Sequence, residues 1–168
     1  MNRMAKDNLD KSRKETSLKT LYFNRFLLIR YVTAVFFFTN LYWLCSLIIS
    51  KNVGAVVPGL TLVFIIRAVW EQCTMYSSHI DNARKTILTY KIMLIENIVY
   101  IAALFTPIFK KLYPFLVDNT KSHMFILFIN VIGAVLCLIS LNRLNKIKNQ
   151  SDKQFKYIKQ YKQNIKMK

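Results

Sequence analysis

The chain alternates between long apolar stretches and polar, mostly basic segments. The first apolar stretch contains about 25 residues and a single charge, Arg30. Roughly 20 apolar residues are enough to cross a bilayer, so this stretch is long enough to span one with some tilt. Three further apolar stretches follow it. The pattern predicts an all-α membrane protein, a four-helix transmembrane bundle over residues 25–142. The predicted spans are residues 26–50, 53–70, 91–109 and 124–141.

The two ends of the chain differ from these spans. Residues 1–24 form a polar, basic N-tail. Residues 143–168 form a second basic tail, in which apolar side chains fall within about a third of a helical wheel. This pattern is typical of a basic amphipathic helix on a membrane surface; a solvated, partly disordered tail is the alternative. The side chains expected to face lipid headgroups are Lys153, Lys156, Lys159, Lys162 and Lys166.

Composition and charge set the orientation. The chain is 54% hydrophobic yet has a net charge of +17, which fits apolar spans between basic segments. Residues 1–25, the connection at 71–91 and the C-tail together hold nineteen basic residues, against four in the other two loops. Because basic loops stay in the cytoplasm, the sequence predicts a multi-pass protein of the cell membrane with both termini cytosolic.

Polar residues inside the spans suggest a site. In the predicted topology Arg30, Arg67 and Glu96 all lie roughly 5–8 Å below the cytosolic interface. They are expected to form a charge cluster, with Glu71 at its rim and Asn97 beside it. One interpretation is a polar site for an anion, a proton or a partner helix. The other is a buried Glu96–arginine pair that fixes helix register, with the second arginine reaching the interface.

Three smaller expectations concern single residues. Pro58, near the start of the second span, is expected to kink it, because proline lacks a backbone donor. Asn40 and Asn130 lie deep in their spans and are expected to bond between helices. The three cysteines are odd in number and widely spaced, so buried free thiols are expected.

The sequence offers little catalytic chemistry. His79 and His123 fall in loops on opposite sides of the predicted membrane and cannot share a metal site. No phosphate-binding, dinucleotide-binding, metalloprotease or nucleophile motif is present. No enzyme, cofactor or metal is therefore expected. The basic residues flank apolar spans without a nucleic-acid recognition motif, which favours lipid headgroups over nucleic acid.

The segment from Tyr22 to Trp43, YFNRFLLIRYVTAVFFFTNLYW, resembles the opening of a group of small four-span proteins of low-GC Gram-positive bacteria. Some of these carry an automatic label as a cellobiose-type phosphotransferase-system IIA subunit. That label implies a soluble helical bundle with a phosphorylated histidine. The apolar spans of this chain and its two loop histidines depart from that pattern.

Three functions remain open at this point. The first is an accessory or regulatory subunit that binds partner membrane proteins and anionic lipid. The second is a small oligomeric transporter or channel subunit that uses the layer of Arg30, Arg67 and Glu96. The third is a protective protein of the bacteriocin-immunity kind. A membrane-protein partner or a homo-oligomer is expected in either of the first two.

Overall fold

The structure is a computed structural model that describes residues 3–78, 83–152, 155 and 157–160. Within these residues it is helical and contains no β-strand, in agreement with the predicted all-α class. The elements in chain order are α1 (Arg3–Ile49), the short 3-10 helix η1 (Val53–Ala55), α2 (Val56–Ser78), α3 (Arg84–Ala103), α4 (Phe109–Leu112) and α5 (Thr120–Lys148).

Four helical segments of the described chain are long and apolar enough to cross a membrane. Their outward surfaces carry large apolar side chains such as Leu60, Ile66 and Phe128. Such surfaces suit contact with lipid tails and would be costly in water. The predicted four-span architecture is therefore confirmed at the level of helix number, length and composition. The candidate spans are Phe23–Ile49, Val53–Met75, Arg84–Ala103 and Thr120–Lys148.

The third span differs most from its prediction. It was expected at 91–109, but α3 begins at Arg84 and ends at Ala103. The early part of α3 looked like a loop in the sequence because it contains hydroxyl side chains. Thr86, Thr89 and Tyr90 are in fact buried and hydrogen-bonded to α1 or α2. Polar groups with partners can enter a helix bundle at little cost, so the span starts about two turns earlier.

The start of α2 contains the proline of the predicted kink. Pro58 lies in the first turn of this helix, directly after the 3-10 helix η1. Proline is tolerated in a first turn. The kink at this position stays a prediction. The first helix is much longer than the span predicted at 26–50, because α1 runs without interruption from Arg3 through Ile49.

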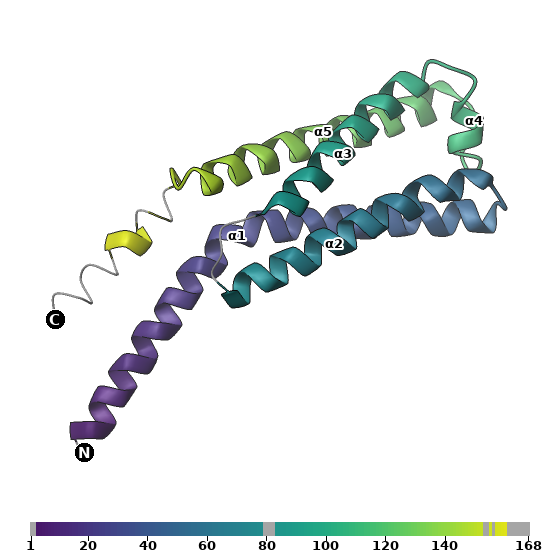
Figure 1. Cartoon of the computed structure of the whole chain (residues 1–168). Helices are drawn as coiled ribbons and strands as arrows, with labels where there is room; N and C mark the ends of the chain where they lie inside the picture. The colour runs from purple at the N-terminus through teal and green to yellow at the C-terminus, as the bar shows by residue number, and fades with distance from the viewer. Residues whose placement is uncertain (1–2, 79–82, 153–154, 156, 161–168) are drawn as a thin grey trace.

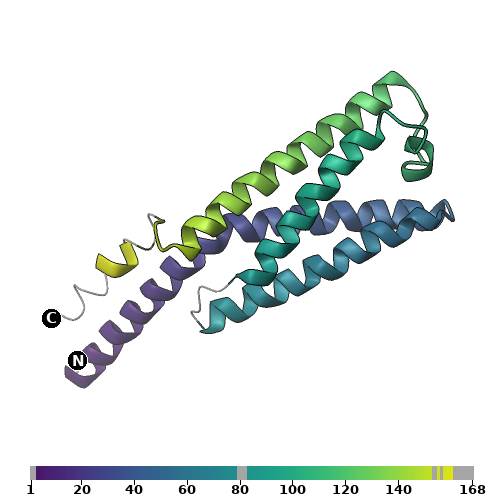
Figure 2. The same cartoon turned by 45° about the horizontal axis from the view of Figure 1, so that its top comes forward.

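The bundle has two distinct ends. Figure 1 shows α1 beside α2 and α3 beside α5, with the N-terminal part of α1 projecting past the other helices. We call the end where α5 finishes the Asp152 end, and the opposite end the α4 end. Figure 2 shows, as Figure 1 does, that the two helix pairs approach each other toward the Asp152 end and diverge toward the α4 end.

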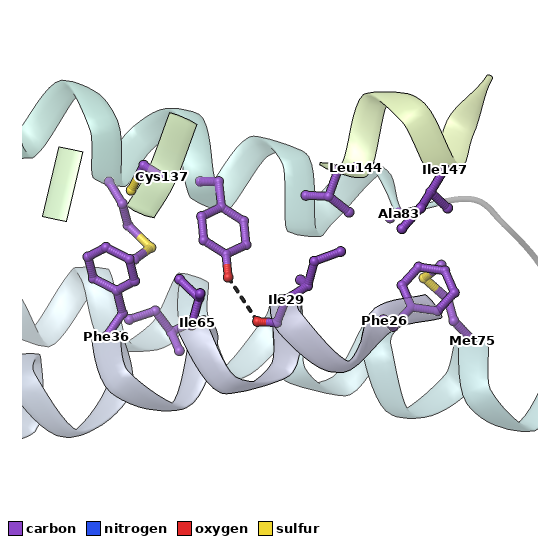
Figure 3. Packing of buried hydrophobic residues seen from close by; sticks show 12 residues of the cluster. Phe26, Ile29, Phe36, Ile65, Met75, Ala83, Cys137, Leu144 and Ile147 are labelled. Atoms are coloured by element: carbon purple, nitrogen blue, oxygen red, sulfur yellow. Dashed lines mark hydrogen bonds between the residues drawn. The ribbon is translucent and has the colours of Figure 1, made fainter. Parts of the chain in front are cut away.

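The main core lies where the helix pairs meet. Ile29 and Phe36 of α1 pack with Ile65 of α2, Tyr90 of α3 and Leu144 of α5. Figure 3 shows this cluster and the hydrogen bond from the Tyr90 hydroxyl to the Ile29 carbonyl, with an O···O distance of 3.0 Å. All four long helices thus contribute to one apolar cluster with a satisfied polar group inside it.

A smaller cluster closes the α4 end. Phe109 and Tyr113 are buried there with Leu104 and Ile126. Trp43 of α1 stacks on Tyr113 at 5.5 Å between ring centroids and donates its indole N–H to the Leu112 carbonyl at 3.2 Å. The segment around α4 therefore attaches to both helix pairs, where they have diverged.

Candidate functional site

The structure separates the residues of the predicted charge cluster. Arg30 donates from Nη2 to the Gln72 carbonyl at 3.5 Å, whereas the Glu96 carboxyl accepts from the Thr61 hydroxyl at 2.7 Å. Gln72 and Thr61 both belong to α2 and are about eleven residues apart, roughly 16 Å along the helix. Glu96 therefore lies much nearer the α4 end than Arg30.

This correction follows from the position of α3. With the span starting near residue 91, Glu96 was expected about five residues inside it. The helix begins at Arg84, so Glu96 is about twelve residues from its start, roughly 18 Å. Among the described residues Glu96 makes no ion pair with either arginine, and its side-chain partner is Thr61.

Glu71 has a structural task at the Asp152 end. Its carboxylate accepts from the backbone N–H groups of Lys85 and Thr86 at 3.0 and 2.7 Å, and from the Thr86 hydroxyl at 2.7 Å. These are first-turn groups of α3, and the N-cap residue Ala83 has no side chain able to satisfy them. Glu71 of α2 thus caps α3 from a neighbouring helix, and its negative charge suits the helix N-terminus.

Asn97 belongs to a helix contact. Its amide donates to the Met93 carbonyl at 2.7 Å, and its Oδ1 faces Gly133 of α5. A Cβ on Gly133 would stand 2.5 Å from that oxygen, so a larger residue here would require the Asn97 side chain to move. The other two intramembrane asparagines also donate within their own helices, Asn40 to Phe36 and Asn130 to Ile126.

Two exposed cations lie well inside their candidate spans, further from a span end than the other exposed cations of the described chain. Arg67 of α2 and Lys91 of α3 are both exposed, and neither side chain bonds to another described residue. Arg67 lies eight residues before Met75, the last residue of its candidate span. Lys91 lies seven residues after Arg84, the first residue of its own span. Both are therefore roughly 10–12 Å from the Asp152 end. We call them the outward cations. Sequence analysis missed Lys91 because it placed this residue at a span boundary.

A groove opens between α1 and α2 on the outer surface, with a volume of about 490 Å³. Its polar residues gather toward the Asp152 end, and its apolar residues toward the α4 end. The Arg30 guanidinium lies over the Phe23 ring at 4.8 Å, which fixes its orientation at the polar end. We call this feature the α1–α2 groove. Its lining residues are Arg30, Thr33, Ala34, Phe37, Phe38, Ile66, Val69, Gln72 and Cys73.

Behind the groove, a hydrogen-bond network connects three helices. The Gln72 amide donates to the Thr33 hydroxyl at 3.1 Å, and the Thr33 and Tyr90 hydroxyls lie 2.9 Å apart. The Thr33 and Tyr90 hydroxyls are also within hydrogen-bond distance of the Ile29 carbonyl. These buried groups therefore support the wall of the groove beside Arg30 and hold α1, α2 and α3 in register.

Sequence reasoning also missed a buried ion pair at the Asp152 end. Arg25 Nη2 lies 2.8 Å from Asp152 Oδ1 and Nε lies 2.9 Å from Oδ2, with both side chains fully buried. Arg25 also donates to the Ile147 carbonyl and lies over the Phe155 ring. Asp152 is the sole acid of the C-tail, which was the available signal for this contact.

The predicted lipid-binding tail lies largely outside the described residues, which exclude Lys153, Lys156, Lys162 and Lys166. Lys159 is described and exposed. Ile158, next to it, is buried, so this part of the tail packs on the protein. The surface-helix prediction is not tested by these residues.

A polar cluster lies at the α4 end, around the start of α5. Asp118 accepts from His123 at 2.7 Å and lies 3.3 Å from the Lys110 ammonium. Hydrogen bonds from His123 and then from Lys110 lower the pKa of the Asp118 carboxyl. Burial raises the pKa of the nearby Tyr113 phenol.

The cysteines were expected to be free and buried. All three thiols are free, but only Cys137 is buried, whereas Cys45 and Cys73 are exposed.

Comparison with protein-family models, curated proteins and solved structures finds no match to this chain. The sequence resemblance of Tyr22 to Trp43 therefore stays a prediction. Function must be argued from three features of the molecule: the outward cations, the α1–α2 groove and the Glu96–Thr61 contact.

Proposed function

We propose that the protein is an accessory or regulatory subunit of the cell membrane that binds a partner membrane protein through the outward cations. The supporting observation is the exposure of Arg67 and Lys91 within candidate spans, without side-chain partners among the described residues. A lone cation costs about 2.5–3.5 kcal/mol at the centre of a membrane helix and less toward its end. A carboxylate on a partner helix at the same depth would offset this cost for both cations.

The proposal includes an orientation and a lipid contact. The Asp152 end would face the cytosol, because the segments outside the candidate spans at that end contain twelve basic residues and those at the α4 end contain three. The basic tails would then lie near the anionic headgroups of the inner leaflet. Reporter domains fused after Lys168 and inserted at Val117 should give cytosolic and external signals, respectively.

Crosslinking in native membranes tests the partner. A photoreactive amino acid at Trp70, an exposed residue one turn from Arg67, should capture a heterologous membrane protein that mass spectrometry can identify. The double variant Arg67→Leu/Lys91→Leu should lose this product, and Arg67→Lys/Lys91→Arg should keep it. Lys121→Leu, which removes an exposed charge at the α4 end, is the control. A product that persists in the double leucine variant would refute the proposed role of the cations.

A second candidate is a small oligomeric transporter or channel subunit, favoured by Glu96. Its carboxyl group lies deep in a candidate span with a threonine hydroxyl as its partner, and ionisable groups at such depth often serve proton or cation pathways. In this case Trp70 would capture a second copy of the chain. Cation flux into proteoliposomes should then fall in Glu96→Gln and persist in Glu71→Gln.

A further inference from the structure

The α1–α2 groove has the chemical polarity of a membrane lipid. Arg30 and Gln72 lie at one end. Phe38 lies eight residues from Arg30 on α1 and Ile66 six residues from Gln72 on α2, roughly 9–12 Å away toward the α4 end. The lining of the groove therefore changes from polar to apolar along the helices, and so along the membrane normal. A phospholipid changes from charged to apolar along the same direction. A groove of about 490 Å³ is also within the usual size range for small-ligand sites.

The depth of Arg30 matches a phosphate group. The α1 span of 27 residues is about 40 Å long, close to the thickness of a bilayer with its headgroups. Arg30 lies about seven residues from the start of this span, roughly 10 Å. With its long side chain directed toward the interface, the guanidinium reaches the boundary between headgroups and hydrocarbon.

The chemistry of Arg30 also suits a phosphate. A guanidinium has five N–H donors in one plane and binds phosphate oxygens through two parallel hydrogen bonds. Its face lies over Phe23 and one nitrogen is near the Gln72 carbonyl, so its plane is oriented before any ligand arrives. Gln72 in turn is buried and bonded to Thr33. This preorganisation reduces the entropy lost on binding.

We infer that the α1–α2 groove binds one anionic phospholipid, with its phosphate on Arg30 and an acyl chain along Ala34, Phe38 and Ile66. This inference deepens the lipid-binding part of the proposed function and rests on its orientation. It does not depend on the outward cations, because Arg67 and Lys91 do not line the groove. A partner helix is the competing occupant, but the single positive charge at the polar end matches an anionic amphiphile more closely than an apolar helix.

Lipid retention provides the test. The intact chain is placed in nanodiscs of equal parts phosphatidylglycerol and phosphatidylcholine, extracted, and examined by native mass spectrometry. The unaltered protein should retain one phosphatidylglycerol in preference to phosphatidylcholine. Arg30→Gln should lower phosphatidylglycerol retention about tenfold, because a charge-assisted phosphate contact is lost. Arg84→Gln removes an exposed charge at the same end, outside the groove, and should have no effect.

A second pair of variants tests the acyl-chain part without changing charge. Ala34→Phe should fill the groove and lower retention of both lipids, whereas Val35→Phe, on a neighbouring exposed position, should not. Equal retention by Arg30→Gln and the unaltered protein would overturn the inference, as would capture of a protein instead of a lipid by a photoreactive group at Phe38. The Trp70 crosslink should persist in Arg30→Gln, so that failure of the lipid site and failure of the partner site are distinguished.

Discussion

Arg25 and Asp152 are 127 residues apart in sequence and meet in a fully buried, two-pronged ion pair. Arg25 lies in α1 near the start of its candidate span, and Asp152 follows the end of α5. The pair therefore joins the first and last long helices at the Asp152 end. Asp152 also accepts from the backbone N–H of Phe155, so the same carboxylate shapes the chain that leaves the bundle.

Breaking this pair should be costly. Arg25→Leu or Asp152→Leu alone should lower the free energy of unfolding by about 3–5 kcal/mol, because each leaves one buried charge without its counterion. The double variant Arg25→Leu/Asp152→Leu should be more stable than either single variant, since neither charge remains. Unfolding in mixed detergent micelles measures all three. Single variants that are as stable as the unaltered protein would contradict this account.

The contact between Gly133 and Asn97 gives a matched glycine test. Gly133→Ala should lower stability by about 1–3 kcal/mol, because the new methyl group would meet Asn97 Oδ1 at 2.5 Å. Gly59→Ala should not be destabilising, since its Cβ would have only Leu44 Cδ1 nearby, at 4.0 Å. Thermal unfolding compares the two. If adding Asn97→Ala to Gly133→Ala restores the lost stability, the clash with the asparagine is established as the cause.

Removing the carboxylate of Glu71 should loosen the start of α3. Glu71→Ala should cost about 0.5–2 kcal/mol, the usual range for losing a helix cap. Hydrogen exchange should accelerate at the amides of Lys85 and Thr86, which donate to this side chain. Glu71→Gln keeps one acceptor oxygen, so its stability and its exchange rates should lie between those of Glu71→Ala and the unaltered protein. Unchanged exchange at both amides in Glu71→Ala would exclude the capping role.

The polar cluster at the α4 end predicts a pH dependence. The pKa of Asp118 in the folded protein is lower than its ordinary value of 3.8, through His123 first and Lys110 second. The stabilisation is therefore complete above the unfolded pKa and is lost as the pH falls through the lower folded pKa. Carboxyl NMR titration should give an Asp118 midpoint below 3.8. His123→Ala should raise this midpoint more than Lys110→Ala; the opposite order would contradict the assignment.

The sequence predicted those parts of the fold that depend on local composition. The spans at 26–50 and 124–141 were recognisable because their apolar runs are long and hardly interrupted. The third span was misplaced because Thr86, Thr89 and Tyr90 look like loop residues until their partners on other helices are known. Helix bounds in a bundle thus depend on contacts that composition does not reveal.

The site was less predictable than the fold, for a related reason. The expected layer of Arg30, Arg67 and Glu96 depended on equal depths, and a shift of about two turns in α3 was enough to separate Glu96 from the arginines. The pair of Arg25 and Asp152 could not be derived from periodicity, because it joins distant segments of the chain. Its one sequence signal was an isolated acid in a basic tail.

The uninterrupted course of α1 has a mechanical consequence. About twenty residues of this helix precede its candidate span, and they continue into the span without a break. Figures 1 and 2 show that the projecting part of α1 leaves the bundle at an angle to the span, while the helix itself continues. A change in that angle would therefore move the stretch that contains Arg25 and Arg30, and with it the ion pair and one wall of the groove.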